Sequence, residues 1–409
     1  MKKEHYLLII GCIIAIVFRF WFITLSPQPF IFDQYEYYKF ALQILNRGLF
    51  ADSARLYGYP LFQAILYKIF TPYSIQPVIV FQVILDSLTA LAIYYWTKLL
   101  FRQTNIPWIA FFFYIFNPYT SAYVGVILSE VVGIFFTTLL LYFFTLFWLK
   151  KKLLVFLLFS FIAGFLPQIR PAFLYFSFGL FGISLYRYWK QKWAILIGIL
   201  LFTLSFLYVL WGNVVYFNEW KATSVDRIVE RELYISVMVS GRAPYHMKSG
   251  YDVYPKEVMQ LYEEFSRNPK NHYERMVMGK KYLSEATKII ISDPLLFIRQ
   301  RFGKMFFVWE KHFLFYYQES PNTIRDMLVY WGNILLLTSG LSGLLMWFVK
   351  KRSLLAGVYV SLIAYISIIH SVSLAEERYS LPGYPLLFLF AGYALDQLYK
   401  RSFITPNKE

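Results

Sequence analysis

Apolar stretches of about the length that crosses a bilayer recur along the whole chain, separated by short polar segments. About 20 consecutive apolar residues suffice for a helix to span the hydrocarbon core, so the pattern predicts an all-α polytopic membrane protein with about 10 transmembrane helices. We expect the spans at about Tyr6–Leu25, Gln76–Leu100, Ile106–Val124, Glu130–Leu149, Leu153–Leu166, Ala172–Tyr186, Trp193–Trp211, Met327–Val349, Leu354–Val372 and Leu381–Tyr399.

Two shorter helices are expected in the first outer loop, residues 26–75. After Asp33, apolar residues recur at helical spacing, and Gly48 supplies a stop signal. These apolar positions are Tyr37, Phe40, Ala41, Ile44 and Leu45. A second short apolar helix is expected at Pro60–Phe70. Both are too short to cross the bilayer, and we expect them to lie on the membrane surface.

Residues 213–326 form the longest polar region of the chain. Helices are expected at Asp226–Glu232, Tyr254–Asn271 and Glu274–Ile291, and an amphipathic stretch runs from Asp293-Pro294 to Tyr317. The chain therefore divides into an N-terminal membrane module, residues 1–212, this mostly helical extracytoplasmic region, and C-terminal membrane helices, residues 327–409.

The charge pattern supports this topology. The chain is 58% hydrophobic and 16% charged, with a formal net charge of +16. The basic residues gather at the ends of the spans, as in Lys150-Lys151-Lys152 and Lys350-Lys351-Arg352, rather than on one face, which disfavours nucleic-acid binding. Because Lys and Arg mark cytoplasmic helix ends, we expect a multi-pass cell-membrane protein with both termini cytoplasmic. The single cysteine, Cys12, excludes disulfides within the chain.

Three carboxylates on the outer side are candidates for catalysis. Asp33 begins the first surface helix, with Glu36 one turn later, and Glu130 begins the fourth span. Each position also suits a helix cap, where a carboxylate interacts with free N–H groups. A carboxylate at the membrane face can instead take a proton from an acceptor hydroxyl or amine. Asp33 and Glu130 together could also bind a divalent cation through oxygen ligands.

Three arginines lie outside, against the positive-inside trend. Arg170 lies between Pro167 and Pro171, where the backbone cannot continue as plain helix and presents the side chain at the outer surface. Arg378 follows two glutamates, and Arg55 precedes Tyr57. Guanidinium groups bind phosphate through paired hydrogen bonds, so these arginines are candidates for a phosphate site. The alternatives are lipid headgroups for Arg170 and the neighbouring glutamates for Arg378.

Two further charges, Arg19 and Asp86, lie inside predicted spans. Charges within a membrane usually face a partner or a cavity. We expect Arg19 and Asp86 to pair and to tie the first span to the second, which is a structural role.

Several short motifs, in order and on the same expected face, resemble the GT-C superfamily of integral-membrane glycosyltransferases. They are Asp33 with Tyr37, Ala41 and Gly48; Gly58-Tyr59-Pro60-Leu61-Phe62; Leu128-Ser129-Glu130; Gln168-Ile169-Arg170-Pro171; and Glu377-Arg378-Tyr379 with Pro382 and Pro385. The nearest likeness is to the bacterial relatives of protein O-mannosyltransferases and of lipid A aminoarabinose transferases. One departure concerns Gln34, because the superfamily often has Asp-Glu where this chain has Asp33-Gln34.

The resemblance implies a helical membrane bundle with surface helices in the first outer loop. It implies transfer of a sugar from a polyprenyl-phosphate donor to an extracytoplasmic acceptor, with Asp33 as general base and with Arg170 and Arg378 holding the donor phosphate. Because Gln34 replaces the second acid, two alternatives remain. Either Glu36 or Glu130 supplies that acid, or the site contains no metal and works with one base. The other expected partners are membrane lipids and an acceptor that the sequence does not identify.

Two other functions remain open. A polysaccharide polymerase or ligase also uses outward arginines and a large outer loop, and it would tolerate loss of Asp33. A transporter or flippase of lipid-linked saccharides would place its binding groups near the bilayer midplane between repeated halves. Here we see no internal repeat, and we expect most candidate groups near the membrane surface.

Overall fold

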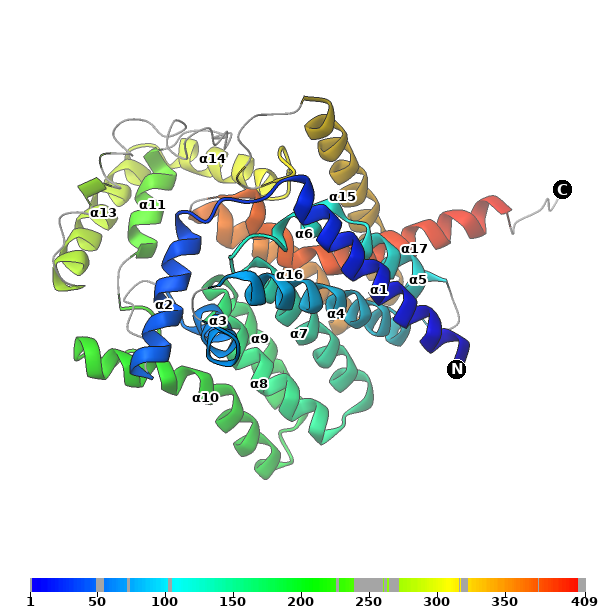
Figure 1. Cartoon of the computed structure of the whole chain (residues 1–409), viewed down its shortest axis with the longest axis horizontal. Helices are drawn as coiled ribbons and strands as arrows, with labels where there is room; N and C mark the ends of the chain where they lie inside the picture. The colour runs from blue at the N-terminus through cyan, green and yellow to red at the C-terminus, as the bar shows by residue number, and fades with distance from the viewer. Residues whose placement is uncertain are drawn as a thin grey trace.

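The computed structural model describes residues 2–48, 55–71, 74–101, 105–225, 228–238, 260, 263–264, 272–315, 317, 323–373 and 375–403. Within these ranges the regular structure is entirely helical (Figure 1). The expected all-α class is therefore confirmed. Six of the described helices are long and apolar enough to cross a membrane. They are α1 (Lys2–Leu25), α4 (Gln76–Leu100), α7 (Glu130–Lys150), α10 (Lys192–Phe217), α15 (Thr323–Lys351) and α16 (Leu354–Val372).

The expected count of ten spans is not confirmed: one of the other four stretches is interrupted, two form shorter helices, and the fourth, α17, has 20 residues but is not among the helices apolar enough to cross. The third stretch divides into α5 (Ile106–Ile115) and α6 (Pro118–Tyr123), and Asn117 caps α6 by accepting a hydrogen bond from the Thr120 N–H. The remaining three are α8 (Leu153–Ile169), α9 (Leu174–Arg187) after the short 3₁₀ helix η1 (Pro171–Phe173), and α17 (Tyr384–Phe403) after the 3₁₀ helix η2 (Glu377–Gly383).

Both helices expected in the first outer loop are present, as α2 (Asp33–Arg47) and α3 (Gly58–Ile69). Gly48 ends α2 in the left-handed conformation at φ 71°, and its N–H donates to the Ile44 carbonyl. The apolar face of α2 packs inward around Ala41 and Ile44. Helix α2 contacts α3, which in turn packs on α4 and α8.

A close backbone approach positions α3. A Cβ atom at Gly58 would lie 2.6 Å from the carbonyl carbon of Gln168, near the end of α8. Only glycine allows this approach without a shift of one backbone. The first residue of α3 therefore lies directly against the segment that carries Arg170.

The outer region contributes α11 (Ile228–Met238), α13 (His272–Ser292) and α14 (Pro294–Phe307). Asp293 begins α14 as its N-cap, accepting a hydrogen bond of 2.9 Å from the Leu296 N–H. Helix α11 packs on α13, and α14 packs on α16. The helix expected at Tyr254–Asn271 lies outside the described residues except at positions 260, 263 and 264, which are helical.

The arrangement of the helices separates two ends of the molecule. The chain-terminal ends of α1 and α17 lie toward one side, and α2, α11 and α13 lie toward the opposite side (Figure 1). Between them the core is a continuous cluster of apolar and aromatic side chains from nearly all the long helices. The residues of the candidate site come from the start of α2, the segment before α3, the start of α7, the residue after α8, and η2 with the residue before it.

Candidate active site

The first carboxylate of the site, Asp33, is the first residue of α2. The residue before it, Phe32, has φ 50°, a strained backbone conformation for a bulky side chain, and its ring stacks on Tyr317 at 6.3 Å. No side chain caps α2, so Asp33 does not form the capping hydrogen bond that its position suggested. Both of its carboxylate oxygens instead contact arginines.

Arg55 holds the two carboxylates of the first turn of α2. Its Nη2 atom lies 2.7 Å from Asp33 Oδ1 and 2.7 Å from Glu36 Oε2, and its Nε atom donates to Glu36 at 3.0 Å. The guanidinium also lies 4.8 Å from the centre of the Tyr37 ring, within cation–π range. These side chains are the most exposed of the site, since 32% of the Asp33 side chain and 52% of Glu36 remain accessible.

Arg170 and Glu130 form a second, buried pair. Arg170 Nη1 lies 3.0 Å from Glu130 Oε1 and 3.2 Å from Ser129 Oγ. Gly133, one turn after Glu130, leaves room for the arginine, because a Cβ atom there would lie 2.9 Å from Arg170 Cγ. The second oxygen of Glu130 makes no hydrogen bond within the part of the chain that the structure describes.

The structure corrects two expectations about Arg170. Pro167 lies inside α8, and the helix ends at Ile169, so the break comes at Arg170 and Pro171. Arg170 is also not presented at the surface, because it is only 8% exposed. The attraction of the buried Glu130 carboxylate draws the guanidinium inward, where each charge compensates the burial of the other.

Arg378 joins the two pairs. Its Nη2 atom lies 3.4 Å from Asp33 Oδ2, and its Nε atom lies 3.7 Å from Glu130 Oε1 and donates to Glu376. The Tyr379 ring lies beside both buried guanidinium groups, 5.5 Å from that of Arg378 and 5.8 Å from that of Arg170. The adjacent glutamates therefore have different roles, since Glu376 binds Arg378 and Glu377 binds His312.

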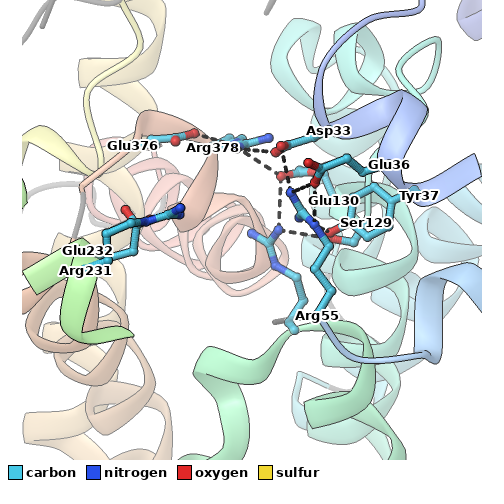
Figure 2. Close-up of polar contacts among 11 residues, drawn as sticks. Asp33, Glu36, Tyr37, Arg55, Ser129, Glu130, Arg231, Glu232, Glu376 and Arg378 are labelled. Carbon is cyan, nitrogen blue, oxygen red and sulfur yellow. Dashed lines mark hydrogen bonds and ion pairs between the residues drawn. The ribbon is translucent and has the colours of Figure 1, made fainter. Parts of the chain in front are cut away.

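Together these contacts define one charged cluster, which we call the site cluster: Asp33, Glu36, Arg55, Glu130, Arg170, Glu376 and Arg378 (Figure 2). It holds four carboxylates and three guanidinium groups, a net charge of −1 when all are ionised. All six outer residues expected from the sequence are thus brought together. The alternative partner expected for Arg378, a neighbouring glutamate, is present as Glu376, whereas sequence reasoning did not single out Tyr379 as a ring shared by two guanidinium groups.

The electrostatics of Asp33 follow from these contacts. Burial by itself would raise the pKa of the Asp33 carboxyl, but the charges and hydrogen bonds of Arg55 and Arg378 outweigh it and hold the pKa below its ordinary value. Asp33 is therefore an ionised carboxylate at neutral pH and can accept a proton.

Gln34, the departure from the Asp-Glu pattern, has a structural role. Its side chain is buried; its oxygen accepts a hydrogen bond of 2.8 Å from the Ile127 N–H, and its amide nitrogen donates to Pro29 at 2.5 Å. Gln34 therefore ties the start of α2 to the segment that leads into Ser129 and Glu130. A second acid at this position would lack the amide donor for the Pro29 carbonyl.

The arrangement does not fit a metal ion. Among the described residues there is no group of three or more His, Cys, Asp or Glu side chains that could hold one. Asp33 and Glu130 both face Arg378, so a guanidinium occupies the place between them that a divalent cation would need. We derive no step through a metal.

The predicted intramembrane pair lies apart from the site cluster. Arg19 Nε lies 2.6 Å from Asp86 Oδ2, and both side chains are fully buried. Arg19 also donates to the backbone carbonyls of Tyr114 and Ile115, and the Tyr114 hydroxyl donates to Asp86. The contacts connect α1, α4 and α5.

No protein-family model and no curated protein matches the chain. Solved structures with the same fold include three of the oligosaccharyltransferase AglB from Archaeoglobus fulgidus. One of them is a complex with an inhibitory peptide and a dolichol-phosphate, and it has a TM-score of 0.52 at 14% sequence identity. The alignment covers 100% of this chain and 53% of the AglB chain. The complex with Zn and sulfate has a TM-score of 0.52 at 15% identity, covering 96% and 49%.

The apo form has a TM-score of 0.53 at 14% identity, covering 98% and 51% of the two chains. The chain thus spans about half the length of these structures. At this identity the likeness shows the fold alone, which this chain shares with the AglB structures. The expected resemblance to the GT-C superfamily is thus supported by the fold alone, and membership of the superfamily and the bacterial subtype remain expectations.

Proposed function

We propose that this protein is a glycosyltransferase that moves a sugar from a polyprenyl-phosphate donor to an extracytoplasmic acceptor. The observation that carries the proposal is the position of Asp33, an ionised carboxylate held between Arg55 and Arg378 on a surface helix of a membrane bundle. The fold supports it, since the AglB structures are oligosaccharyltransferases and one of them contains a dolichol-phosphate.

The chemistry needs two functions, and the site cluster offers both. Asp33 takes the proton of the acceptor hydroxyl or amine as that group attacks the anomeric carbon. The bond from this carbon to the phosphate oxygen breaks, and the polyprenyl phosphate leaves with the electron pair. Displacement from the side opposite the phosphate inverts the anomeric configuration. Phosphate is a good leaving group, so cation stabilisation suffices there and no protonating acid is required.

The arginines are assigned to the donor phosphate. Arg170 hydrogen-bonds through Nη1 alone within the described part of the chain, which leaves Nη2 and Nε for phosphate oxygens. Arg378 and Arg55 contact Asp33, so a bound phosphate would compete with Asp33 for them. Binding of the donor would then release Asp33 toward the acceptor. Glu130 and Glu36 orient the arginines and are not needed as proton acceptors.

The orientation in the membrane is part of the proposal. Helix α2, whose first turn carries Asp33 and Glu36, lies toward the side of the molecule opposite the terminal ends of α1 and α17 (Figure 1). The loops Lys150–Lys152 and Lys350–Arg352 carry the basic clusters that mark a cytoplasmic side. We therefore place the protein in the cell membrane with both termini cytoplasmic and the site cluster outside.

The test replaces the base and keeps its shape. Purified full-length protein in liposomes is given a panel of radiolabelled polyprenyl-phosphate sugars, and transfer and release of the label are measured for wild type, Asp33→Asn and Glu36→Gln. We expect Asp33→Asn to lower the rate by about 10²–10⁴-fold, the usual contribution of a general base. Glu36→Gln, a matched change at the more exposed carboxylate, should lose less than tenfold.

Equal rates for Asp33→Asn and wild type would remove Asp33 as the base and would favour a ligase that works through its arginines. If no donor in the panel is consumed but labelled lipid crosses the liposome membrane, the protein is a transporter and the proposal fails.

A further inference from the structure

Helix α11 of the outer region brings two charged side chains to the site cluster. Arg231 and Glu232 lie next to Glu376 and across from Asp33 and Arg55 (Figure 2). They pair with each other, with Arg231 Nη2 at 2.5 Å and Nε at 3.1 Å from Glu232 Oε1. Only 12% of the Arg231 side chain and 20% of the Glu232 side chain are exposed. Removing a charged pair from water costs free energy, so this nearly buried pair differs from an ion pair on a solvent-exposed surface.

The charges of the site cluster act on Glu232. Burial raises the pKa of its carboxyl, Arg231 opposes that effect, and the negative charges of Glu376 and Asp33 raise it further. The Tyr379 hydroxyl is subject to the charges of both Glu232 and Asp33. The charge of Asp33 therefore acts on Glu232 across the site, although the two residues are about 200 positions apart in the sequence; Figure 2 shows them on opposite sides of the site.

The position of α11 is held firmly. Ser236 follows Glu232 by one turn on the same face, and its hydroxyl donates to the Ser373 carbonyl at 2.9 Å. Two buried cations of α14 hold the same serine: Arg301 donates to its hydroxyl at 2.6 Å, and Lys304 donates to its carbonyl at 2.5 Å. Ser373 lies five residues before Arg378, so these bonds fix α11 relative to η2.

The pair offers chemistry that the donor does not need. The donor phosphate is an anion, and Arg55, Arg170 and Arg378 already supply guanidinium groups for it. Glu232 adds a carboxylate, which accepts hydrogen bonds, beside Arg231, which donates them. Neighbouring hydroxyls of a sugar can donate to one and accept from the other. An amine would pair with Glu232 but would meet the positive charge of Arg231.

We propose that Arg231 and Glu232 bind the acceptor, and that the acceptor is a glycan that presents neighbouring sugar hydroxyls. This inference rests on the proposed glycosyl transfer and adds the acceptor class and the residues that select it. Glu232 accepts a hydrogen bond from one hydroxyl, Arg231 donates to the next, and the reacting hydroxyl is thereby directed toward Asp33.

The experiment separates acceptor binding from donor chemistry. Full-length protein in liposomes is saturated with the donor that the panel identifies, and the acceptor probes are methyl glycosides and a serine-containing peptide. We expect transfer to one or more methyl glycosides. Glu232→Gln should raise the acceptor KM on the order of tenfold to hundredfold, as expected for the loss of a hydrogen bond to a charged group. The donor KM should change much less than the acceptor KM.

The control is Glu230→Gln, the same change two residues away on another face of α11, and Glu232→Asp should recover part of the loss. An unchanged acceptor KM in Glu232→Gln overturns the inference. So does transfer to the peptide but to no glycoside, or consumption of the donor without any glycoside product. If the wild type consumes no donor at all, the proposed function itself fails, so the two failures are distinct.

Discussion

At the scale of single residues, the environment of Asp33 depends on residues that are distant in the sequence. Its place at the start of an amphipathic helix follows from the local pattern, and so does its role as a candidate base. Its partners do not, because Arg55 and Arg378 lie 22 and 345 positions away in the sequence. The sequence predicted all six outer charges as candidates from their residue types, yet assigned none of the ion pairs among them, which depend on packing between helices.

The pH dependence of the reaction tests the Asp33 environment. Because two guanidinium groups lower its pKa, the base stays ionised well below neutral pH, and the wild-type kcat/KM should stay nearly level down to about pH 5. Arg55→Gln removes one of these charges, so the pKa should rise and the acid limb of the profile should move up by about one pH unit or more. The profile is measured from pH 4 to 8.

Lys39→Gln is the matched control, since it removes a positive charge from the exposed side of α2, where Lys39 lies over the Tyr35 ring. Its acid limb should coincide with that of wild type. The stability of the fold should also decrease at low pH. Ionised Asp33 stabilises the fold above its ordinary pKa, and this contribution is lost as the pH falls through the lowered pKa. An acid limb that does not move in Arg55→Gln contradicts the pairing.

At the scale of elements, η2 is the part whose position the reaction depends on most, because it carries Arg378. Hydrogen bonds from the segment after α14 hold η2 in place. His312 Nδ1 lies 2.5 Å from Glu377 Oε1, and the His312 N–H donates to Glu377 Oε2 at 2.9 Å. Lys311 donates to the Glu377 carbonyl at 2.6 Å and to Ser380 at 2.9 Å. Burial lowers the pKa of Lys311 to about 7, against the opposing charges of Glu377 and Glu310.

Weakening the contact between His312 and Glu377 should affect donor binding more than the chemical step. In His312→Ala the Nδ1 contact is lost, Glu377 is less restrained, and Arg378 shifts away from the donor phosphate. We expect the donor KM to rise about tenfold, with a smaller change in kcat. His312→Asn retains a side-chain hydrogen-bond donor near Nδ1 and should restore most of the affinity. Both are measured by donor titration at saturating acceptor, and equal donor KM values in wild type and His312→Ala would show that η2 is positioned independently.

At the scale of the whole molecule, the Arg19–Asp86 pair connects helices that are far apart in the chain. The sequence predicted the pair because two charges within spans need partners. The structure shows that α5 also takes part, since its carbonyls and the Tyr114 hydroxyl complete the hydrogen bonds. Arg19 and Asp86 are fully buried, and Arg19 is among the largest fully buried side chains of the described residues. The pair thus supports the bundle beneath the first outer loop.

Breaking one half of the pair should destabilise the bundle strongly. Arg19→Met or Asp86→Leu alone leaves a buried charge without its partner, at a cost of about 3–5 kcal/mol in the free energy of unfolding. The double replacement removes both charges and should lose less than either single change. Unfolding is followed by tryptophan fluorescence in detergent. If the double variant loses as much as the two single changes combined, the two residues do not act as a pair.

Local pattern was sufficient for much of this protein. The apolar period of a helix, the thickness of a bilayer and the stop signal at Gly48 act within one stretch of chain. They account for the all-helical class and for α2 and α3. The expected number of crossing helices was not confirmed, because Asn117 and Pro118 interrupt one stretch, α8 and α9 are short, and α17 is not among the helices apolar enough to cross.

The site itself depends on contacts between distant stretches. Arg170 is buried against Glu130 because Gly133 and Gly58 let backbone and side chains approach closely. Arg378 meets Asp33 because η2 is attached to the segment after α14, and Glu232 reaches the cluster because α11 is bonded to the end of α16. None of these neighbours shares a local period, so packing across the bundle determines which charges pair and how each carboxylate behaves.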